Sequence, residues 1–227
     1  MTVSPSVAAL SFTGGKDCCL AYHRVMEQGC KVAVLVTFAP KDQRFKAHPL
    51  PVVQQQAKAM GLPHLICTIE GPNYLQSYRD ALAQLKNDYG IDTLVTGDIL
   101  QVCSDFMERA CADIVALVRP LWQQPREQLL TEILDNFDVL VTCINRQKLP
   151  SVTDDMAVGQ RLSKAWLHQF CEKDKADQAG EYGEFHTMVL DAPLFTHGRI
   201  HITNAQPQKE DHFLFYNVES CRLEPKQ

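Results

Sequence analysis

The sequence predicts an α/β fold: an open, mostly parallel sheet with helices on both faces, followed by a small C-terminal α+β subdomain. Short apolar runs alternate with segments of helical periodicity as far as residue 144, and this alternation ends beyond residue 150. We therefore expect a main domain at 1–150 and a smaller subdomain at 151–227. A chain of 227 residues is short enough for one core with an appendage.

Six short runs have the character of strands, and the run at 31–38 is β-branched and nearly all apolar, as a strand buried on both faces of a parallel sheet is. They lie at 7–11, 31–38, 64–68, 93–96, 115–118 and 139–144. Five segments between them place apolar residues at helical spacing. They lie at 18–28, 51–60, 74–86, 105–114 and 126–134. Gly29 and Gly61 follow two of these helices, where glycine commonly ends a helix. The crossovers should be right-handed.

Beyond Pro150 the order of elements changes. A helix is expected at 158–170, a polar link at 172–180, and strand-like stretches at 187–190, 199–203 and 213–223. Because this part breaks the alternation of strands and helices, we interpret it as the smaller subdomain.

Composition restricts the functional class. With 45% hydrophobic and 22% charged residues the chain is globular, and its net charge of −5 argues against a broad electrostatic grip on nucleic acid, although a local basic patch stays open. No signal segment or run of ~18 apolar residues is present, so we expect a cytoplasmic protein that does not act at a membrane.

Nine cysteines without Cys-x-x-Cys spacing support neither a disulfide framework nor a zinc ribbon. A homo-oligomer stays open.

The first strand ends in Ser11-Phe12-Thr13-Gly14-Gly15-Lys16-Asp17-Cys18, where α/β proteins commonly hold phosphate. Two glycines let backbone N–H groups curl around an anion, and the following helix N-terminus and Lys16 add positive charge. The spacing fits neither the Walker loop nor the dinucleotide fingerprint. A simple Gly-Gly turn with a solvated Lys-Asp pair is the alternative.

This loop resembles the Ser-Gly-Gly-x-Asp-Ser loop of the ATP pyrophosphatases (PP-loop enzymes) of the adenine nucleotide alpha hydrolase superfamily. Residues 180–195, Gly-Glu-Tyr-Gly-Glu-Phe-His-Thr-Met-Val-Leu-Asp-Ala-Pro-Leu-Phe, resemble the Gly-Glu-x-Gly-Glu-[Tyr/Phe]-x-Thr...Asp-x-Pro signature of the diphthine-ammonia ligase family. A charged loop entering a strand is the plainer interpretation of that segment. Further similar blocks occur in the family's order: His48-Pro49, Gly61-Leu62-Pro63, Gly97-Asp98-Ile99, Glu108-Arg109, Pro120-Leu121-Trp122 and Leu129-Leu130.

The chain departs from these patterns in two places. Thr13 and Cys18 stand where the superfamily usually has serine, and Val102-Cys103-Ser104 replaces a more polar stretch. Thr13 keeps a hydroxyl, whereas a thiol is a poorer hydrogen-bond donor. A helix N-terminus next to Lys16 would lower the pKa of the Cys18 thiol. The chemistry that the resemblance implies needs no thiolate.

The resemblance implies a Rossmann-like (HUP-type) fold and a ligase that uses ATP and Mg²⁺ to adenylate a carboxylate, releasing pyrophosphate, and then joins ammonia to it. Its implied acceptor is diphthine on elongation factor 2. Another carboxylate, a tRNA substrate, or nucleotide binding without catalysis are the alternatives. The residues expected to bind ATP are Ser11, Thr13, Gly14, Gly15, Lys16, Asp17, Cys18, Thr37, Phe38, Gly97 and Asp98.

The resemblance also implies which residues take part in the reaction. Lys16 and Asp17 are expected to act at the phosphates, and Asp98 at the metal or ribose, with a turn cap as its alternative. Three residues expected to bind substrate are Glu181, Gly183 and Glu184. Glu184 and His186 are the acid/base candidates for ammonium, with an ordinary surface histidine as the alternative for His186.

Overall fold

The computed structural model describes residues 6–41, 45–101 and 104–226. The departure noted at Val102 and Cys103 lies outside these residues. The chain forms two compact units, and the glycine-rich loop is divided between them. The first unit comprises Met1–Thr13, Asp17–Arg44 and Leu62–Gln123, and the second comprises Gly14–Lys16, Phe45–Gly61 and Gln124–Gln227.

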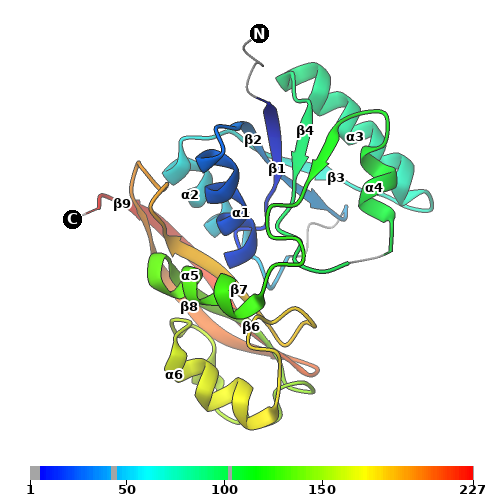
Figure 1. Cartoon of the computed structure of the whole chain (residues 1–227). Coiled ribbons are helices and arrows are strands. Elements are labelled where there is room, and N and C mark those ends of the chain that lie inside the picture. The colour runs from blue at the N-terminus through cyan, green and yellow to red at the C-terminus, as the bar shows by residue number, and fades with distance from the viewer. Residues whose placement is uncertain (1–5, 42–44, 102–103, 227) are drawn as a thin grey trace. The chain divides into compact units, whose positions relative to one another are not determined.

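The first unit is built on a five-stranded sheet in the order β3-β2-β1-β4-β5, flanked by helices (Figure 1). All neighbouring strands are parallel. The strands are β1 (Val7–Ser11), β2 (Lys31–Ala39), β3 (His64–Thr68), β4 (Thr93–Val95) and β5 (Ala116–Val118). The helices are α1 (Lys16–Glu27), α3 (Tyr74–Tyr89) and α4 (Phe106–Cys111). Because all strands are parallel, their carboxyl ends share one edge of the sheet.

Apolar packing holds α3 and α4 to this sheet. Buried side chains of strands β1, β2 and β4 meet those of both helices in one cluster. Its members are Ala9, Val34, Val36, Leu82, Leu85, Ile91, Leu94, Ala110 and Cys111. Asn73 caps α3 by accepting a hydrogen bond from the backbone N–H of Gln76, and Gly90 ends it in the left-handed conformation. Local caps and this core together fix the helix that contributes to the cavity described below.

The second unit is built on a four-stranded sheet in the order β7-β6-β9-β8, paired antiparallel throughout. Its strands are β6 (Asp138–Asn145), β7 (Phe185–Asp191), β8 (Arg199–Glu210) and β9 (Phe213–Glu224). Its helices are α2 (Leu50–Met60), α5 (Arg126–Asn136) and α6 (Lys164–Leu167), the last continuing into a π-helical turn, His168–Glu172. Helix α2 packs on β7, β8 and β9.

Two expectations need correction. The run at 139–144 forms β6 of the antiparallel sheet and is no sixth parallel strand, because a strand buried on both faces has the same apolar pattern in either sheet. Residues 158–162 do not begin a helix: Gly159 and Leu162 donate backbone hydrogen bonds to β6, and α6 begins after Ser163, whose side chain caps it. The last change from one compact unit to the other lies between Gln123 and Gln124, and the expected domain boundary near residue 150 stays a prediction.

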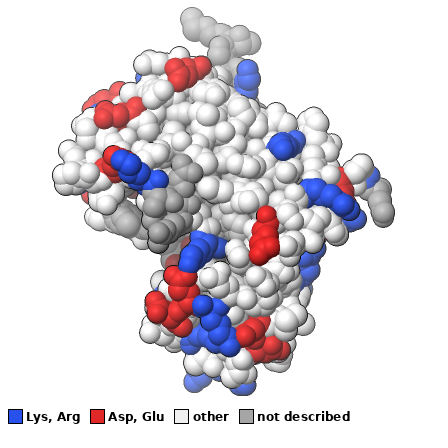
Figure 2. Space-filling view, turned by 180° about the vertical axis from the view of Figure 1, so that it is seen from behind, with Lys and Arg blue, Asp and Glu red and all other residues white. Residues whose placement is uncertain are grey.

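The surface is charged but mixed in sign. On the face in Figure 2, lysine and arginine side chains lie interspersed with aspartate and glutamate. Within the described residues, no helix is both long and apolar enough to cross a membrane.

Candidate functional site

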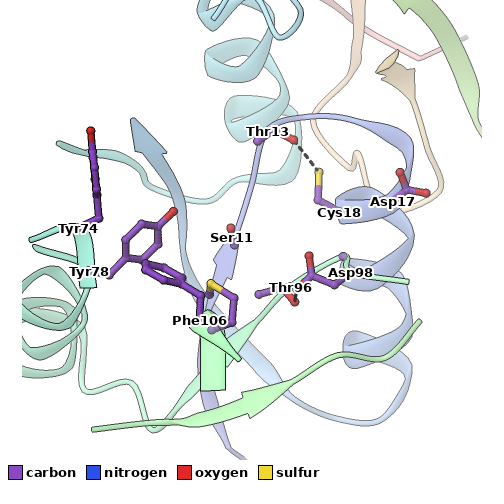
Figure 3. A pocket seen from close by; sticks show the side chains of 11 residues that line it. Ser11, Thr13, Asp17, Cys18, Tyr74, Tyr78, Thr96, Asp98 and Phe106 are labelled. Atoms are coloured by element: carbon purple, nitrogen blue, oxygen red, sulfur yellow. Dashed lines mark hydrogen bonds between the residues drawn. The ribbon is translucent and has the colours of Figure 1, made fainter. Parts of the chain in front are cut away.

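A cavity of about 590 Å³ opens at the carboxyl edge of the parallel sheet in the first unit (Figure 3). Ser11 ends β1, and Thr96 to Asp98 follow β4 directly, so both central strands deliver their ends to it. The described residues that line it are Ser11, Thr13, Asp17, Cys18, Tyr74, Tyr78, Thr96, Gly97, Asp98, Phe106 and Met107. Six of these were expected from the sequence: Ser11, Thr13, Asp17, Cys18, Gly97 and Asp98.

The loop after β4 lies against the first turn of α1. A Cβ atom on Gly97 would lie 2.7 Å from the backbone nitrogen of Cys18 and 2.8 Å from the carbonyl carbon of Asp17. Real Cβ atoms do not approach backbone so closely, so only glycine fits here. The first turn of α1 therefore stands beside the cavity, and the partial positive charge of a helix N-terminus attracts phosphate.

The two adjacent cysteines of this turn, Cys18 and Cys19, have thiol pKa values shifted in opposite directions. Burial raises the pKa of the Cys18 thiol, but hydrogen bonds from Cys19 and Thr13 outweigh it and leave that pKa below its ordinary value. Burial raises the pKa of Cys19 well above its ordinary value. The Sγ atom of Cys18 lies 4.0 Å from Oγ1 of Thr13, a long contact that Figure 3 marks. A thiol is a weaker hydrogen-bonding group than a hydroxyl, so Cys18 holds Thr13 less firmly than a serine would.

Two carboxylates line the same cavity. The Thr96 hydroxyl donates a 2.7 Å hydrogen bond to Oδ2 of Asp98, which orients that side chain, and Asp17 lies in the first turn of α1. Mg²⁺ is usually held by one or two carboxylates together with substrate phosphates. Among the described residues no group of three or more His, Cys, Asp or Glu side chains is arranged to hold a metal. Two carboxylates in one cavity, such as Asp17 and Asp98, are of the ligand type that suits Mg²⁺ bound to a nucleotide.

Aromatic side chains form the wall that the sequence did not reveal. Tyr78 stacks on Phe38 with ring centroids 4.6 Å apart, and Phe106 meets Tyr78 edge-on at 5.1 Å. Tyr74 lies one helical turn before Tyr78 and is 57% exposed. A pair of tyrosines four residues apart in a helix was the available signal. It was missed because such pairs usually pack into a core.

Thr37 and Phe38 are not among the described residues that line the cavity. The Thr37 hydroxyl donates to the carbonyl oxygen of Phe12 at 2.6 Å, and Thr37 is buried, whereas Phe38 supports Tyr78. Their direct contact with adenine stays a prediction.

In the second unit, α2 and β7 hold the glycine-rich segment. The carbonyl oxygen of Gly14 accepts hydrogen bonds from the backbone of Val189 at 2.9 Å and from the side chain of Gln56 at 2.8 Å. The backbone N–H of Lys16 donates to the Thr187 hydroxyl at 3.2 Å. Gly14 has φ +78, and a Cβ there would lie 2.1 Å from Oε1 of Gln56. The left-handed conformation favours glycine here, and any larger residue would also displace the Gln56 side chain.

Lys16 shares this unit with the acidic turn that was expected to bind substrate. Its Nζ atom lies 3.8 Å from Oε1 of Glu181, and Lys16 is only 5% exposed. Gly183 has φ +77 and turns the chain, so that the buried Glu184 accepts a hydrogen bond from the backbone of Tyr182 at 3.0 Å. The structure thus brings Lys16 and Glu181 together.

Two histidines of the second unit meet edge-on. The rings of His48 and His186 have centroids 5.2 Å apart and an interplanar angle of 76°. The pKa of His48 is lowered to about 3. Burial is the main cause, and the neighbouring His186 and Lys16 contribute less. His186 had been expected as an acid/base candidate, whereas His48 had been noted only as part of a family block.

Two family models match the chain in tandem. The model of the diphthamide synthase N-terminal domain matches residues 6–116, and that of the diphthamide synthase C-terminal domain matches residues 125–223. Their junction agrees with the division of the two compact units between Gln123 and Gln124.

The chain is also similar to whole proteins. The diphthine–ammonia ligase of Danio rerio is 26% identical over 212 residues, covering 81% of each chain, and that of Rattus norvegicus is 26% identical over 220 residues, covering 83% of this chain and 80% of its own. A solved structure described as a predicted subunit of tRNA methyltransferase from Methanocaldococcus jannaschii matches 82% of this chain and 98% of its own, with 15% identity and a TM-score of 0.47. Because the two consecutive domain models together span residues 6–116 and 125–223, the chain belongs to the diphthamide synthase family, a family of carbon–nitrogen ligases.

Proposed function

We propose that this protein is an ATP-dependent ligase that adenylates a carboxylate, releases pyrophosphate, and forms an amide with ammonia, with diphthine on elongation factor 2 as the acceptor. One observation carries the proposal: a cavity that combines the first turn of a helix, two carboxylates and an aromatic wall. The named relatives are diphthine–ammonia ligases, which supports the choice of acceptor.

ATP binding follows from the chemistry of the cavity. Tyr74, Tyr78 and Phe106 offer aromatic surface to adenine, since stacked rings recognise a base without needing hydrogen bonds. In this proposal the phosphates lie at the first turn of α1, where the positive end of the helix dipole attracts them. Asp17 and Asp98 would hold Mg²⁺, which neutralises charge on the phosphoryl oxygens when it is bound.

The first step joins the acceptor to AMP. An oxygen of the acceptor carboxylate attacks the α-phosphorus of ATP, the bond to the β-phosphate breaks, and pyrophosphate leaves. Lys16 is the positively charged residue of the loop. It directly precedes Asp17, which lines the cavity, so their Cα atoms lie about 3.8 Å apart. Its ammonium group is suited to the charge of the leaving pyrophosphate. Glu181 then orients Lys16 through their contact.

The second step forms the amide. Ammonia attacks the acyl carbon, the bond between that carbon and the AMP oxygen breaks, and AMP leaves. One proton passes from the attacking nitrogen to a base, for which Glu184 and His186 are the candidates. Ammonium must lose a further proton before attack, because its nitrogen has no free electron pair.

Product analysis tests this function. Purified protein is incubated with ATP, ammonium and diphthine-bearing elongation factor 2, and nucleotides are separated while mass spectrometry follows the acceptor. We expect equal amounts of AMP, pyrophosphate and amidated acceptor, and no product from Lys16→Ala. AMP formation with a different carboxylate only would replace the acceptor, whereas ATP binding without turnover would make the protein a nucleotide-binding sensor.

A further inference from the structure

The segment preceding α2 holds His48 in a defined position. The carbonyl oxygen of Ala47 accepts a 2.6 Å hydrogen bond from the Thr142 hydroxyl on β6. The backbone N–H of His48 donates to the carbonyl oxygen of Phe45 at 3.1 Å, and the carbonyl oxygen of Pro49, at the N-cap position of α2, accepts from the backbone N–H of Val52 at 2.9 Å. Backbone contacts on both sides therefore fix where this imidazole lies within the second unit.

One nitrogen of the His48 ring is buried but makes no hydrogen bond to the described part of the chain. Nδ1 has no hydrogen-bond partner within the described part of the chain, and it is inaccessible to solvent. A buried polar atom left without a partner destabilises the fold, because it loses its hydrogen bonds to water and gains none. Such atoms mark places where a small polar molecule completes the hydrogen bonding.

The groups around His48 favour a neutral molecule over a positively charged one. Burial together with His186 and Lys16 keeps His48 neutral, since its pKa falls to about 3. The Lys16 ammonium group, although it contacts Glu181, also disfavours positive charge at His48. A neutral molecule that donates hydrogen bonds is not repelled. Ammonia fits this description, and ammonium does not.

We propose that His48, with His186 at its edge, binds the ammonia that attacks the activated carboxylate. The inference rests on the proposed function. In the tautomer that carries hydrogen on Nε2, Nδ1 of His48 accepts a hydrogen bond from ammonia. This arrangement leaves the electron pair of the ammonia nitrogen free for the attack. His48 thereby becomes a substrate-binding residue outside the set expected from the sequence.

Binding is tested without turnover. Protein labelled with ¹⁵N-histidine is titrated with ammonium chloride at a pH where much of the ammonium is deprotonated, and ring ¹⁵N shifts are followed. We expect a saturable shift of the His48 resonances, assigned by their loss in His48→Phe, and none with potassium or tetramethylammonium chloride. A shift that is identical with all three salts, or that never saturates, overturns the proposal.

Kinetics test the same residue in the reaction. His48→Phe should raise the KM for ammonium about tenfold, the order of one lost hydrogen bond, while acceptor-dependent exchange of pyrophosphate into ATP without ammonium stays unchanged. His48→Asn, whose amide oxygen lies near the place of Nδ1, should recover part of the loss. His168→Phe is the control, because His168 is exposed and pairs with Glu172. An unchanged KM for ammonium in a folded His48→Phe protein contradicts the proposal. Missing exchange in the wild-type protein contradicts adenylation instead, and the ¹⁵N titration then still decides whether His48 binds ammonia.

Discussion

The side-chain amide of Gln56 donates two hydrogen bonds. One goes to the carbonyl oxygen of Gly14 at 2.8 Å, and the other goes to the carbonyl oxygen of Val189 at 2.7 Å. A fully buried glutamine of α2 thereby joins the glycine-rich segment to β7. The conformation of the loop depends on this residue, which lies 42 positions away from Gly14 in the sequence.

Replacing Gln56 should weaken the fold and the loop together. Gln56→Leu removes both hydrogen bonds and leaves the Val189 carbonyl oxygen without this donor, so we expect the free energy of unfolding to fall by about 2 kcal/mol. Urea denaturation measures it. Gln54→Leu on the exposed face of the same helix is the control and should change stability little. Equal stability of the two variants would show that the side chain is dispensable.

Gly97→Ala should impair nucleotide binding. Its Cβ would meet the backbone of Asp17 and Cys18, so the first turn of α1 must move, and we expect ATP affinity to fall at least about tenfold. Isothermal titration calorimetry measures it. Gly29→Ala is the control: Gly29 has φ +78 but open space around it, so the variant should cost about 1 kcal/mol of stability with ATP affinity retained.

Tyr78→Ala should raise the KM for ATP by about tenfold, because it removes the central ring of the aromatic wall. Phe38→Leu removes only the ring behind it and should have a smaller effect. Steady-state rates at varied ATP concentration measure both. A larger effect of Phe38→Leu would favour Phe38 as the direct contact with adenine.

Cys18→Ser should keep turnover within about twofold of the wild type, because a hydroxyl replaces the thiol's hydrogen bonds and no step needs a thiolate. Rates of AMP release check it, with Cys221→Ser as the control for loss of a thiol outside the cavity. Abolished turnover in Cys18→Ser alone would assign the thiol a chemical role.

Acid should destabilise the protein through His48. In the folded chain its pKa is about 3, below the 6.5 of a free imidazole, so between pH 6.5 and 3 only the unfolded state takes up this proton. Stability is therefore full above pH 6.5 and falls with decreasing pH by up to about 1.4 kcal/mol per unit until about pH 3. Urea denaturation at pH 7 and 5.5 should show a shallower fall in His48→Phe than in wild type or in His168→Phe. Parallel falls would exclude His48 as the source.

Local patterns predicted the parts of this protein that depend on local geometry. The five parallel strands and the Gly14-Gly15-Lys16 loop follow from apolar runs and from the conformational needs of glycine. The pairing of β6 did not follow, because its apolar run is nearly fully buried and so resembles a parallel strand.

Long-range contacts escaped prediction for a similar reason. Nothing near Gln56 in the sequence indicates that its amide meets Gly14, and Tyr78 has the spacing of an ordinary core residue of a helix. Likewise, a histidine before a proline gives no sign that its ring will meet His186. Such roles depend on which distant segments the fold brings together.

Transfer of labelled oxygen tests the central claim most directly. Acceptor protein carrying ¹⁸O in the diphthine carboxylate is incubated with ATP, ammonium and the enzyme, and the products are analysed by mass spectrometry. Attack of the carboxylate on the α-phosphorus, followed by amide formation, predicts one ¹⁸O atom in AMP and none in pyrophosphate. Release of ADP with ¹⁸O in inorganic phosphate would contradict adenylation, because the carboxylate oxygen would then have attacked the γ-phosphorus.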